Sequence, residues 1–164
     1  MNNKEKVLET LRSMGFDLKE VGNDSYMFSY EDTNILYTPF EEDENFLHLA
    51  IPFIFGVTDE NREAVLEAIH DTSLFIKYSK INIMYQSTVW AVYEHYLYTT
   101  DNLEELLEHI IKLLLLTVVT FYKKINGEEI EFTQPNSEGD ADDEPFGLLD
   151  DILESDDEED NNIN

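Results

Sequence analysis

The chain contains no cysteine among its 164 residues, and this absence excludes several kinds of chemistry. Disulfides, thiolate metal sites, cysteine nucleophiles and iron–sulfur clusters all depend on the thiol group. The sequence also lacks a glycine-rich phosphate loop, a Gly-x-Ser-x-Gly elbow and a dinucleotide-binding fingerprint. We therefore expect a protein that is not an enzyme and that holds no cofactor.

Basic residues are scarce. The chain has 10 lysines and arginines against 37 aspartates and glutamates, which gives a formal net charge of −27. Binding to the phosphate backbone of nucleic acids needs lysine and arginine to displace counterions. Anionic membrane surfaces attract polybasic segments for the same electrostatic reason. The charge therefore disfavours both nucleic acids and membranes as partners.

Long hydrophobic runs are also missing. The longest apolar stretch, residues 110–122, is interrupted by Lys112, Thr117 and Thr120, whereas a membrane-spanning helix needs about 20 apolar residues. The first residues show neither the apolar core nor the cleavage site of a secretory signal. We therefore expect a cytoplasmic protein.

The acidic residues are concentrated at the C-terminal end. Residues 138–164 hold 13 of them and no basic residue, and the turn-forming stretch 134–139 precedes this segment. This pattern predicts a folded domain over 1–133 and a disordered acidic tail over 134–164. The tail contains one apolar segment, 146–153. Its apolar side chains are Phe146, Leu148, Leu149, Ile152 and Leu153.

The tail has two interpretations. It can serve only to keep the domain soluble. Alternatively, the segment 146–153 docks as a short helix in a groove of the domain or of a partner.

Helical spacing of apolar residues predicts three helices in the domain. The first ends at Gly15, which suits the left-handed position after a helix. Thr58 is the predicted cap of the second, and the residues 101–104 form a capping-box pattern that opens the third. The third is expected to stop at 126–127. The residues expected on the buried side of the second helix are Val65, Leu66, Ile69 and Ser73.

Five stretches rich in aromatic and β-branched residues predict strands. They are residues 25–30, 35–38, 46–55, 80–86 and 89–98. Turns are expected at 31–34 and near 87–88, and Pro52 indicates an edge position or a bulge. The order is helix, three strands, helix, two strands, helix. The short connections predict an α+β fold with a five-stranded antiparallel sheet and helices segregated on it.

The third predicted helix is apolar on two sides. One stripe consists of Leu107, Ile110, Leu114, Val118 and Phe121. The second stripe consists of Ile111, Leu115, Val119 and Tyr122. A surface helix of a monomer needs one apolar stripe. The second stripe is therefore either covered by the first helix or forms the interface of a homodimer.

Short patterns recur in a fixed order along residues 4–126. They are Val7-Leu8-x-x-Leu11 with Gly15-Phe16, Phe46-Leu47-x-Leu49 with Pro52-Phe53, Asn61-Arg62-x-x-Val65-Leu66-x-x-Ile69, Lys77-Tyr78-x-Lys80, and Asp101-x-Leu103-Glu104-Glu105-Leu106. In the order and spacing of these patterns the chain resembles the YbjN-like proteins, which have the type III secretion chaperone-like fold. The resemblance implies a dimer-forming binding domain, of the kind described as chaperone-like or regulatory, and it carries over no catalytic residue.

Metal-binding patterns in the chain are incomplete. Glu67-x-x-His70 is half of a di-iron helix motif, but no second copy exists. Asp140-x-Asp142-x-Glu144 begins like a calcium loop, yet proline occupies the position that needs glycine. We therefore expect no metal site.

Aromatic residues offer the best candidates for a binding surface. Tyr26 and Phe28 project to one side of their strand, and Trp90 and Tyr96 share a side of another. Core packing is one interpretation. The other is that these four residues contact a protein segment, a basic or partly unfolded client, in a protein-binding adaptor. An alternative for the whole chain is an acidic nucleic-acid mimic that inhibits a protein with a basic cleft.

Overall fold

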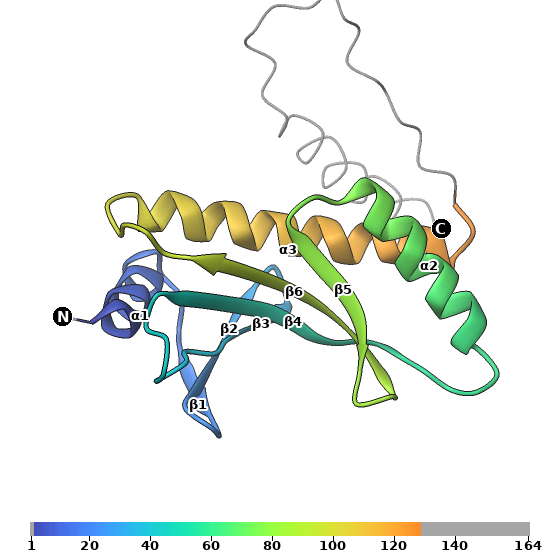
Figure 1. Ribbon diagram of the computed structural model, residues 1–164, viewed down its shortest axis with the longest axis horizontal. Helices are drawn as coiled ribbons and strands as arrows, with labels where there is room; N and C mark the ends of the chain where they lie inside the picture. Colours follow the sequence, from blue (N-terminus) through green and yellow to red (C-terminus); the bar gives the residue numbers. More distant parts are fainter. Residues whose placement is uncertain (1, 129–164) are drawn as a thin grey trace, which may run out of the picture. The chain divides into compact units, whose positions relative to one another are not determined.

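A computed structural model describes residues 2–128, which form an α+β domain (Figure 1). The helices are α1 (Asn3–Ser13), α2 (Arg62–Phe75) and α3 (Leu103–Ile125). The strands are β1 (Lys19–Val21), β2 (Ser25–Tyr30), β3 (Thr33–Tyr37), β4 (Phe46–Gly56), β5 (Ser79–Met84) and β6 (Thr88–Tyr96). The predicted boundary at residue 133, the acidic tail and its segment 146–153 lie outside the described residues.

All neighbouring strands are antiparallel, in the order β1-β2-β3-β4-β6-β5. The α+β class and the three helices are confirmed, but the sheet has six strands rather than the predicted five. The missed strand, β1, has only three residues, and all three are exposed. Such a strand forms by pairing with β2 and carries no apolar alternation that a sequence pattern could reveal.

The ends of α1 follow from local chemistry. The Asn2 side chain accepts a hydrogen bond from the backbone N–H of Glu5 (2.8 Å), and the Glu5 carboxylate accepts one from the backbone N–H of Asn2 (3.1 Å). At the other end Gly15 has φ +93°, and the Phe16 N–H reaches back to the carbonyl of Leu11 (3.1 Å). This pattern satisfies the last carbonyls of the helix and confirms the predicted role of Gly15.

The start and the buried side of α2 differ from the prediction. The side chain of Asn61 accepts a hydrogen bond from the backbone N–H of Thr58, and the Thr58 hydroxyl accepts one from the backbone N–H of Asn61. These two bonds close a turn, and the helix begins only at Arg62. The buried residues of α2 are Val65, Ala68 and Thr72. Of the predicted residues, Val65 is buried and Ile69 packs against the core, whereas Leu66 and Ser73 are exposed. The buried side of α2 is the one that packs against α3 and β5.

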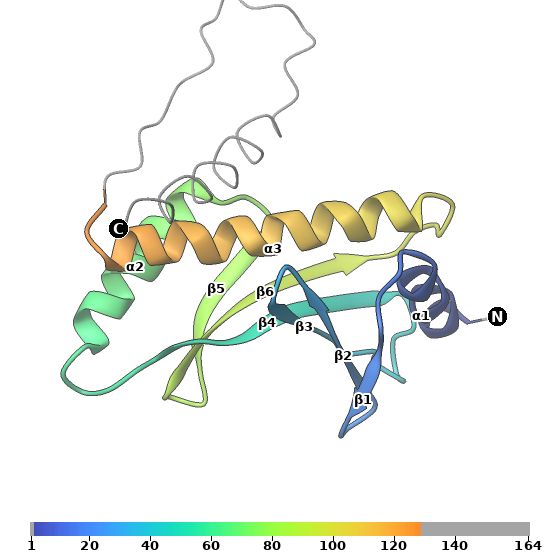
Figure 2. The same ribbon diagram turned by 180° about the vertical axis from the view of Figure 1, so that it is seen from behind.

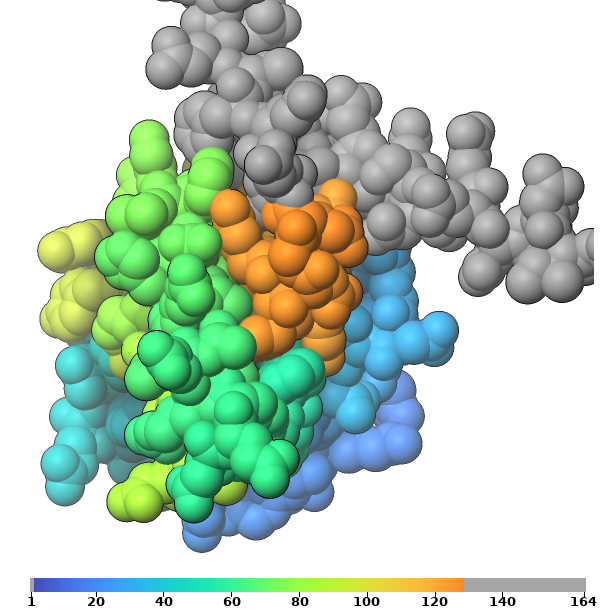
Figure 3. All heavy atoms as spheres, turned by 90° about the vertical axis from the view of Figure 1, so that its right-hand side faces the viewer, coloured from blue at the N-terminus to red at the C-terminus, as the bar shows by residue number. Residues whose placement is uncertain are grey.

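Helix α3 runs along one face of the sheet (Figures 1 and 2). Its N-terminal end lies near α1, and its C-terminal half packs beside α2 (Figure 3). Between α3 and α2, the Lys124 ammonium lies 4.7 Å from the centroid of the Phe75 ring. The hydroxyl of Thr117 on α3 forms a hydrogen bond with that of Ser79, the first residue of β5. No helix among residues 2–128 is long and apolar enough to cross a bilayer.

Both apolar stripes of α3 are largely covered within the single chain. In the second stripe, Ile111 and Leu115 are buried, Val119 is half-buried and Tyr122 is partly exposed. The homodimer stays a prediction, and Tyr122 is the member of the stripe with the most exposed surface.

Three hairpin turns use left-handed backbone at residues other than glycine. Between β1 and β2, Asn23 and Asp24 have φ 52° and 56°. Glu31 and Asp32 have φ 45° and 60°, and in the β5–β6 turn Tyr85 and Gln86 have φ 52° and 61°. Consecutive left-handed residues match the twist of the strands that they join. The β5–β6 turn, at Tyr85 and Gln86, lies two residues earlier than the predicted position at 87–88.

Candidate functional site

The two faces of the sheet differ in what covers them. Buried residues of α1, α2 and α3 join one core with one face of the sheet. A separate apolar cluster lies on the other face and contains no residue of the helices. Its members are Ala50, Trp90 and Val92, with Leu36 and Met84 packed against them. We call this second side, away from the three helices, the open face.

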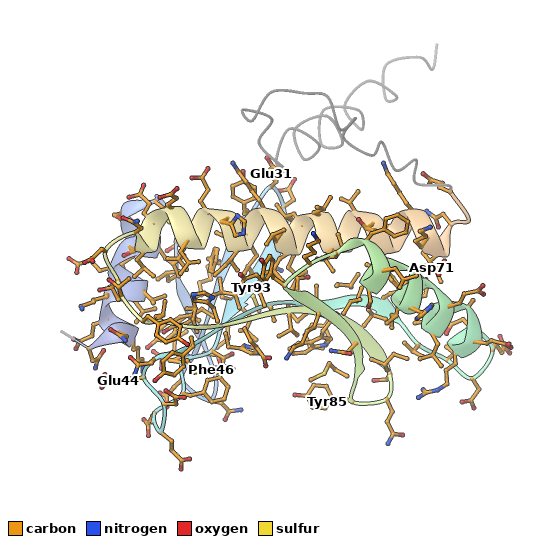
Figure 4. All side chains as sticks on the ribbon, turned by 45° about the horizontal axis from the view of Figure 1, so that its top comes forward. Glu31, Glu44, Phe46, Asp71, Tyr85 and Tyr93 are labelled. Atoms are coloured by element: carbon orange, nitrogen blue, oxygen red, sulfur yellow. The ribbon has the colours of Figure 1, made fainter. Side chains whose placement is uncertain are left out.

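Figure 4 shows the difference between the faces at labelled residues. Tyr93 lies between β6 and α3, whereas Phe46 and Tyr85 lie on the side away from α3. Phe46 and Glu44 are near one end of the open face, and Tyr85 is near the other. The open face therefore presents aromatic side chains at both ends.

The strand register places one row of residues across all six strands of the open face. The row, in sheet order, is Lys19, Met27, Leu36, Ala50, Val92 and Lys80. Its centre is apolar and its two ends, on the edge strands, are lysines. Lysine at an edge opposes edge-to-edge aggregation of sheets. Another chain is therefore expected to contact the apolar centre of the open face rather than its edges.

A bulge in β4 shapes one end of the open face. Between the pairs Ile51–Ala91 and Phe55–Val89, β4 has three residues where β6 has one, Trp90. Phe53, in the middle of the bulge, has φ 56°. A left-handed aromatic residue is strained by about 1–3 kcal/mol and persists only where its surroundings hold it. The predicted bulge at Pro52 is confirmed.

Three aromatic rings meet at this bulge and form what we call the Trp90 cluster: Phe53, Tyr85 and Trp90. The ring of Phe53 stands 5.2 Å from that of Trp90 at 68°, and the ring of Tyr85 stands 5.8 Å away at 69°. Trp90 is only 9% exposed, while Phe53 and Tyr85 are 70% and 76% exposed. A buried ring thus supports two outward rings, both held at left-handed backbone positions.

The indole nitrogen of Trp90 has no hydrogen-bonding partner among the described residues, and it is buried. A buried N–H without an acceptor costs about 1–3 kcal/mol. Buried tryptophan normally finds such a partner. The cluster therefore holds one unsatisfied donor beside two exposed rings.

Helix α3 contacts the bulge from the opposite face. The Tyr122 hydroxyl donates a hydrogen bond to the carbonyl of Ile54, the residue after Phe53. This bond supplies a donor to a carbonyl inside the bulge, where β4 departs from its ladder with β6. Tyr122 thus positions the backbone that carries Phe53.

We expect Tyr122→Phe to loosen the bulge. The ring remains, but the Ile54 carbonyl loses its donor, which is worth about 1 kcal/mol of stability. Trp90 is the only tryptophan, so its fluorescence reports the bulge directly: the variant should show a changed emission spectrum as well as a lower urea midpoint. An unchanged spectrum together with an unchanged midpoint would contradict the positioning role.

The other end of the open face combines aromatic and acidic groups. Phe40 packs edge-on against Phe46 (5.1 Å) and His48 (5.9 Å). Beside them lies an open cleft of about 880 Å³. Its charged lining residues are Lys4, Asp24, Glu41, Glu42 and Glu44. Acidic side chains outnumber the single lysine, so this end attracts cationic groups.

Two titratable groups at this end have a shifted pKa: burial raises the pKa of Tyr37, which lines the cleft, and the other group is His48. Burial lowers the pKa of His48 below its ordinary value, and the charge of Glu94, opposite it on β6, counteracts part of the shift. Its buried Nδ1 has no hydrogen-bonding partner among residues 2–128. The neutral imidazole is therefore the form that the fold favours.

Acidification should accordingly weaken the fold through His48. The unfolded chain binds a proton near pH 6.5 and the folded chain only at lower pH, so stability is fully present above pH 6.5 and falls as the pH drops towards the folded pKa. One proton changes the folding equilibrium at most about tenfold per pH unit. Urea unfolding between pH 7.5 and 5 should show a shallower fall for His48→Gln than for the wild type and for His70→Gln, an exposed control. Equal slopes in all three proteins would contradict this role of His48.

The four predicted contact residues do not form one surface. Phe28 is buried in the core on the helix side of the sheet, and Tyr26 packs against that core. Trp90 and Tyr96 lie on the open face, six positions apart on β6. Tyr96 is partly exposed, and its hydroxyl accepts from the Asn45 side chain (3.2 Å).

Sequence reasoning missed Phe53 and Tyr85, the most exposed rings of the Trp90 cluster. Strict alternation along β4 assigns Phe53 to the side of Ile51 and Phe55, which is the core side. The bulge reverses that assignment. Proline directly before Phe53 was the available signal, because proline inside a central strand implies a broken ladder.

Comparison with solved structures identifies the architecture. The crystal structure of YbjN from E. coli, described as a candidate transcription regulator, matches with a TM-score of 0.57 over 78% of this chain and 96% of that chain. The fold is YbjN-like. At 6% sequence identity the likeness shows the fold alone. No protein-family model and no curated protein matches the sequence.

No group of three or more histidine and carboxylate side chains in the described part of the chain is placed to hold a metal ion. The open face offers aromatic rings and one unsatisfied indole donor. An acidic cleft, which is also lined by Lys4 of α1, adjoins the open face at Phe46. These are the groups that recognise a segment of protein.

Proposed function

We propose that this domain is a non-enzymatic regulatory or adaptor protein that binds a segment of another protein on its open face. The observation that carries the proposal is the Trp90 cluster. Phe53 and Tyr85 are mostly exposed, and the backbone of Phe53 is held in a strained, left-handed conformation inside the bulge of β4. Strain of this kind is concentrated at binding sites, and aromatic anchors dominate the energetics of protein interfaces.

The charge of the chain supports a basic partner. The net charge of −27 creates a negative field that steers cationic segments towards the domain and speeds their association. The acidic cleft at the Phe46 end supplies local carboxylates for lysine or arginine side chains. Apolar contact at one end and ionic contact at the other would give the complex both affinity and direction.

Affinity capture with matched variants tests this function. The full chain and the double variant Phe53→Ser/Tyr85→Ser are immobilised and exposed to the native cytosol, and bound proteins are eluted stepwise with salt. Leu74→Ser is the control, because Leu74 on α2 is 70% exposed, like Phe53, but belongs to another surface. We expect one dominant partner that stays bound to the wild type and to the control near 1 M salt, where exposed charges are screened within about 3 Å. The double variant should not retain this partner.

Two outcomes would overturn the proposal. If the double variant retains the same partner as the wild type, the open face is not the binding surface. If every bound protein is a nucleic-acid-binding protein released at modest salt, the acidic-mimic interpretation is favoured instead.

A further inference from the structure

We propose that the Trp90 cluster binds a proline-rich segment in the polyproline II conformation, and that basic residues flanking this segment reach the acidic cleft. The inference rests on the proposed function, because it names the class of segment that the open face would take. Three features of the open face lead to it: the unsatisfied indole donor, the geometry of the exposed rings, and the distance to the cleft.

The unsatisfied indole donor selects segments with free carbonyls. A bound helix uses its carbonyls in its own hydrogen bonds, and a strand uses them in a ladder with a neighbouring strand. A polyproline II segment has no internal hydrogen bonds, so its carbonyls are available to an N–H on the face of a sheet. The Nε1–H of Trp90 needs such an acceptor. Phe53 and Tyr85 are mostly exposed, so their side chains have room to rotate and admit it.

The exposed rings suit proline side chains. Phe53 and Tyr85 each meet the Trp90 ring edge-on, at 68° and 69°, and both are mostly exposed to solvent. Proline rings pack against exposed aromatic rings, and the preformed polyproline II helix loses little entropy on docking.

The distance between the cluster and the cleft fits a flanked peptide. Trp90 and Tyr96 are six residues apart on β6, which is about 20 Å of strand at 3.3 Å per residue. A polyproline II segment rises about 3.1 Å per residue, so about six residues cover the same length. The cleft beside Phe46, the cross-strand partner of Tyr96, is lined by Glu41, Glu42 and Glu44. A lysine or arginine that flanks the proline-rich stretch would therefore meet carboxylates.

Tryptophan fluorescence measures this binding at its site, because Trp90 is the only tryptophan of the chain. The probe is a twelve-residue peptide of alternating proline and leucine with two arginines at each end. Two control peptides keep the arginines but replace the centre, one with glycine and serine and one with a helix-forming alanine and leucine sequence. We expect only the proline peptide to change the Trp90 emission in a saturable manner at physiological salt.

Variants assign the contacts. Phe53→Ala and Tyr85→Ala should each weaken the proline peptide at least tenfold, whereas Leu74→Ala should leave its affinity unchanged. Trp90→Phe keeps an aromatic ring but removes the indole donor. Calorimetry should show that this variant also binds the proline peptide at least tenfold more weakly. All four variants are checked by circular dichroism for an intact fold.

Equal binding of all three peptides, or tighter binding of the helical one, would overturn this proposal while leaving the proposed function intact. No binding of the proline peptide to the folded wild type would overturn it as well. The proposed function fails by a different result, namely partner capture that survives replacement of both Phe53 and Tyr85.

Discussion

Replacing Leu115 with aspartate should unfold the domain. Leu115 is 6% exposed and belongs to the core between the helices and the sheet. An ionised carboxylate at such a position loses its hydration without gaining a partner, and the packing of the leucine is lost as well. We expect a loss of at least about 4 kcal/mol, a large part of the 5–15 kcal/mol that stabilises a typical domain. Circular dichroism and urea unfolding measure the effect.

The same substitution separates the two interpretations of the third helix. Leu74→Asp, at an exposed position of α2, is the control and should change stability little. If Leu115→Asp stays folded and its mass in solution falls to half that of the wild type, the second stripe is a dimer interface and our expectation is wrong. The partly exposed Tyr122 is the position at which a dimer contact is best probed, by Tyr122→Asp.

Phe28→Ala should cost about 3–5 kcal/mol of stability, the usual range for a large aromatic side chain removed from a core. Phe28 is 2% exposed, and its ring lies 4.8 Å from that of Phe16, which follows the C-terminal glycine of α1. Its loss would leave a cavity between β2 and the segment that follows α1. Thermal or urea unfolding of the purified variant gives the number.

A neighbouring residue provides the comparison for Phe28. Met27 is the adjacent residue of β2, points to the open face and is half-buried. Met27→Ala should therefore cost less than half as much. Equal losses for the two variants would contradict the assignment of Phe28 to the helix side of the sheet.

These expectations change how binding experiments are designed. A lost interaction after substitution of Phe28 or Leu115 would report unfolding, not a missing contact. Phe53 and Tyr85 are the informative positions, since their side chains are mostly in solvent and their removal leaves the core unchanged.

Much of the fold could be predicted from local patterns. The α1 and α3 helices are confirmed, as are the hairpins, because helical spacing and turn residues act within a few residues of each other. The capping box predicted at 101–104 is wrong: α3 begins after Asn102, whose side chain makes no capping hydrogen bond. Gly15 ends α1 as expected, and Gly127 follows α3 in the same left-handed conformation. The bulge near Pro52 was also within reach, since proline cannot donate to a strand ladder.

The third helix shows where such patterns stop. Its amino acids revealed two apolar stripes but not what covers them. Coverage depends on where α1, α2 and the sheet lie in space, and only the tertiary structure shows that Ile111 and Leu115 are buried within the chain. The same limit explains the missed strand β1, whose three exposed residues become a strand only beside β2.

By itself, the sequence determined the fold class, the absence of thiol chemistry, the negative charge and the existence of aromatic candidates. The tertiary structure decided which aromatic residues form a surface. It placed Tyr26 and Phe28 on the helix side, and it turned Phe53 outward beside Trp90. The physical reason is that side chains alternate along a strand only while the ladder is regular. A bulge of β4 against β6 breaks that rule through contacts between residues about 40 positions apart in the chain.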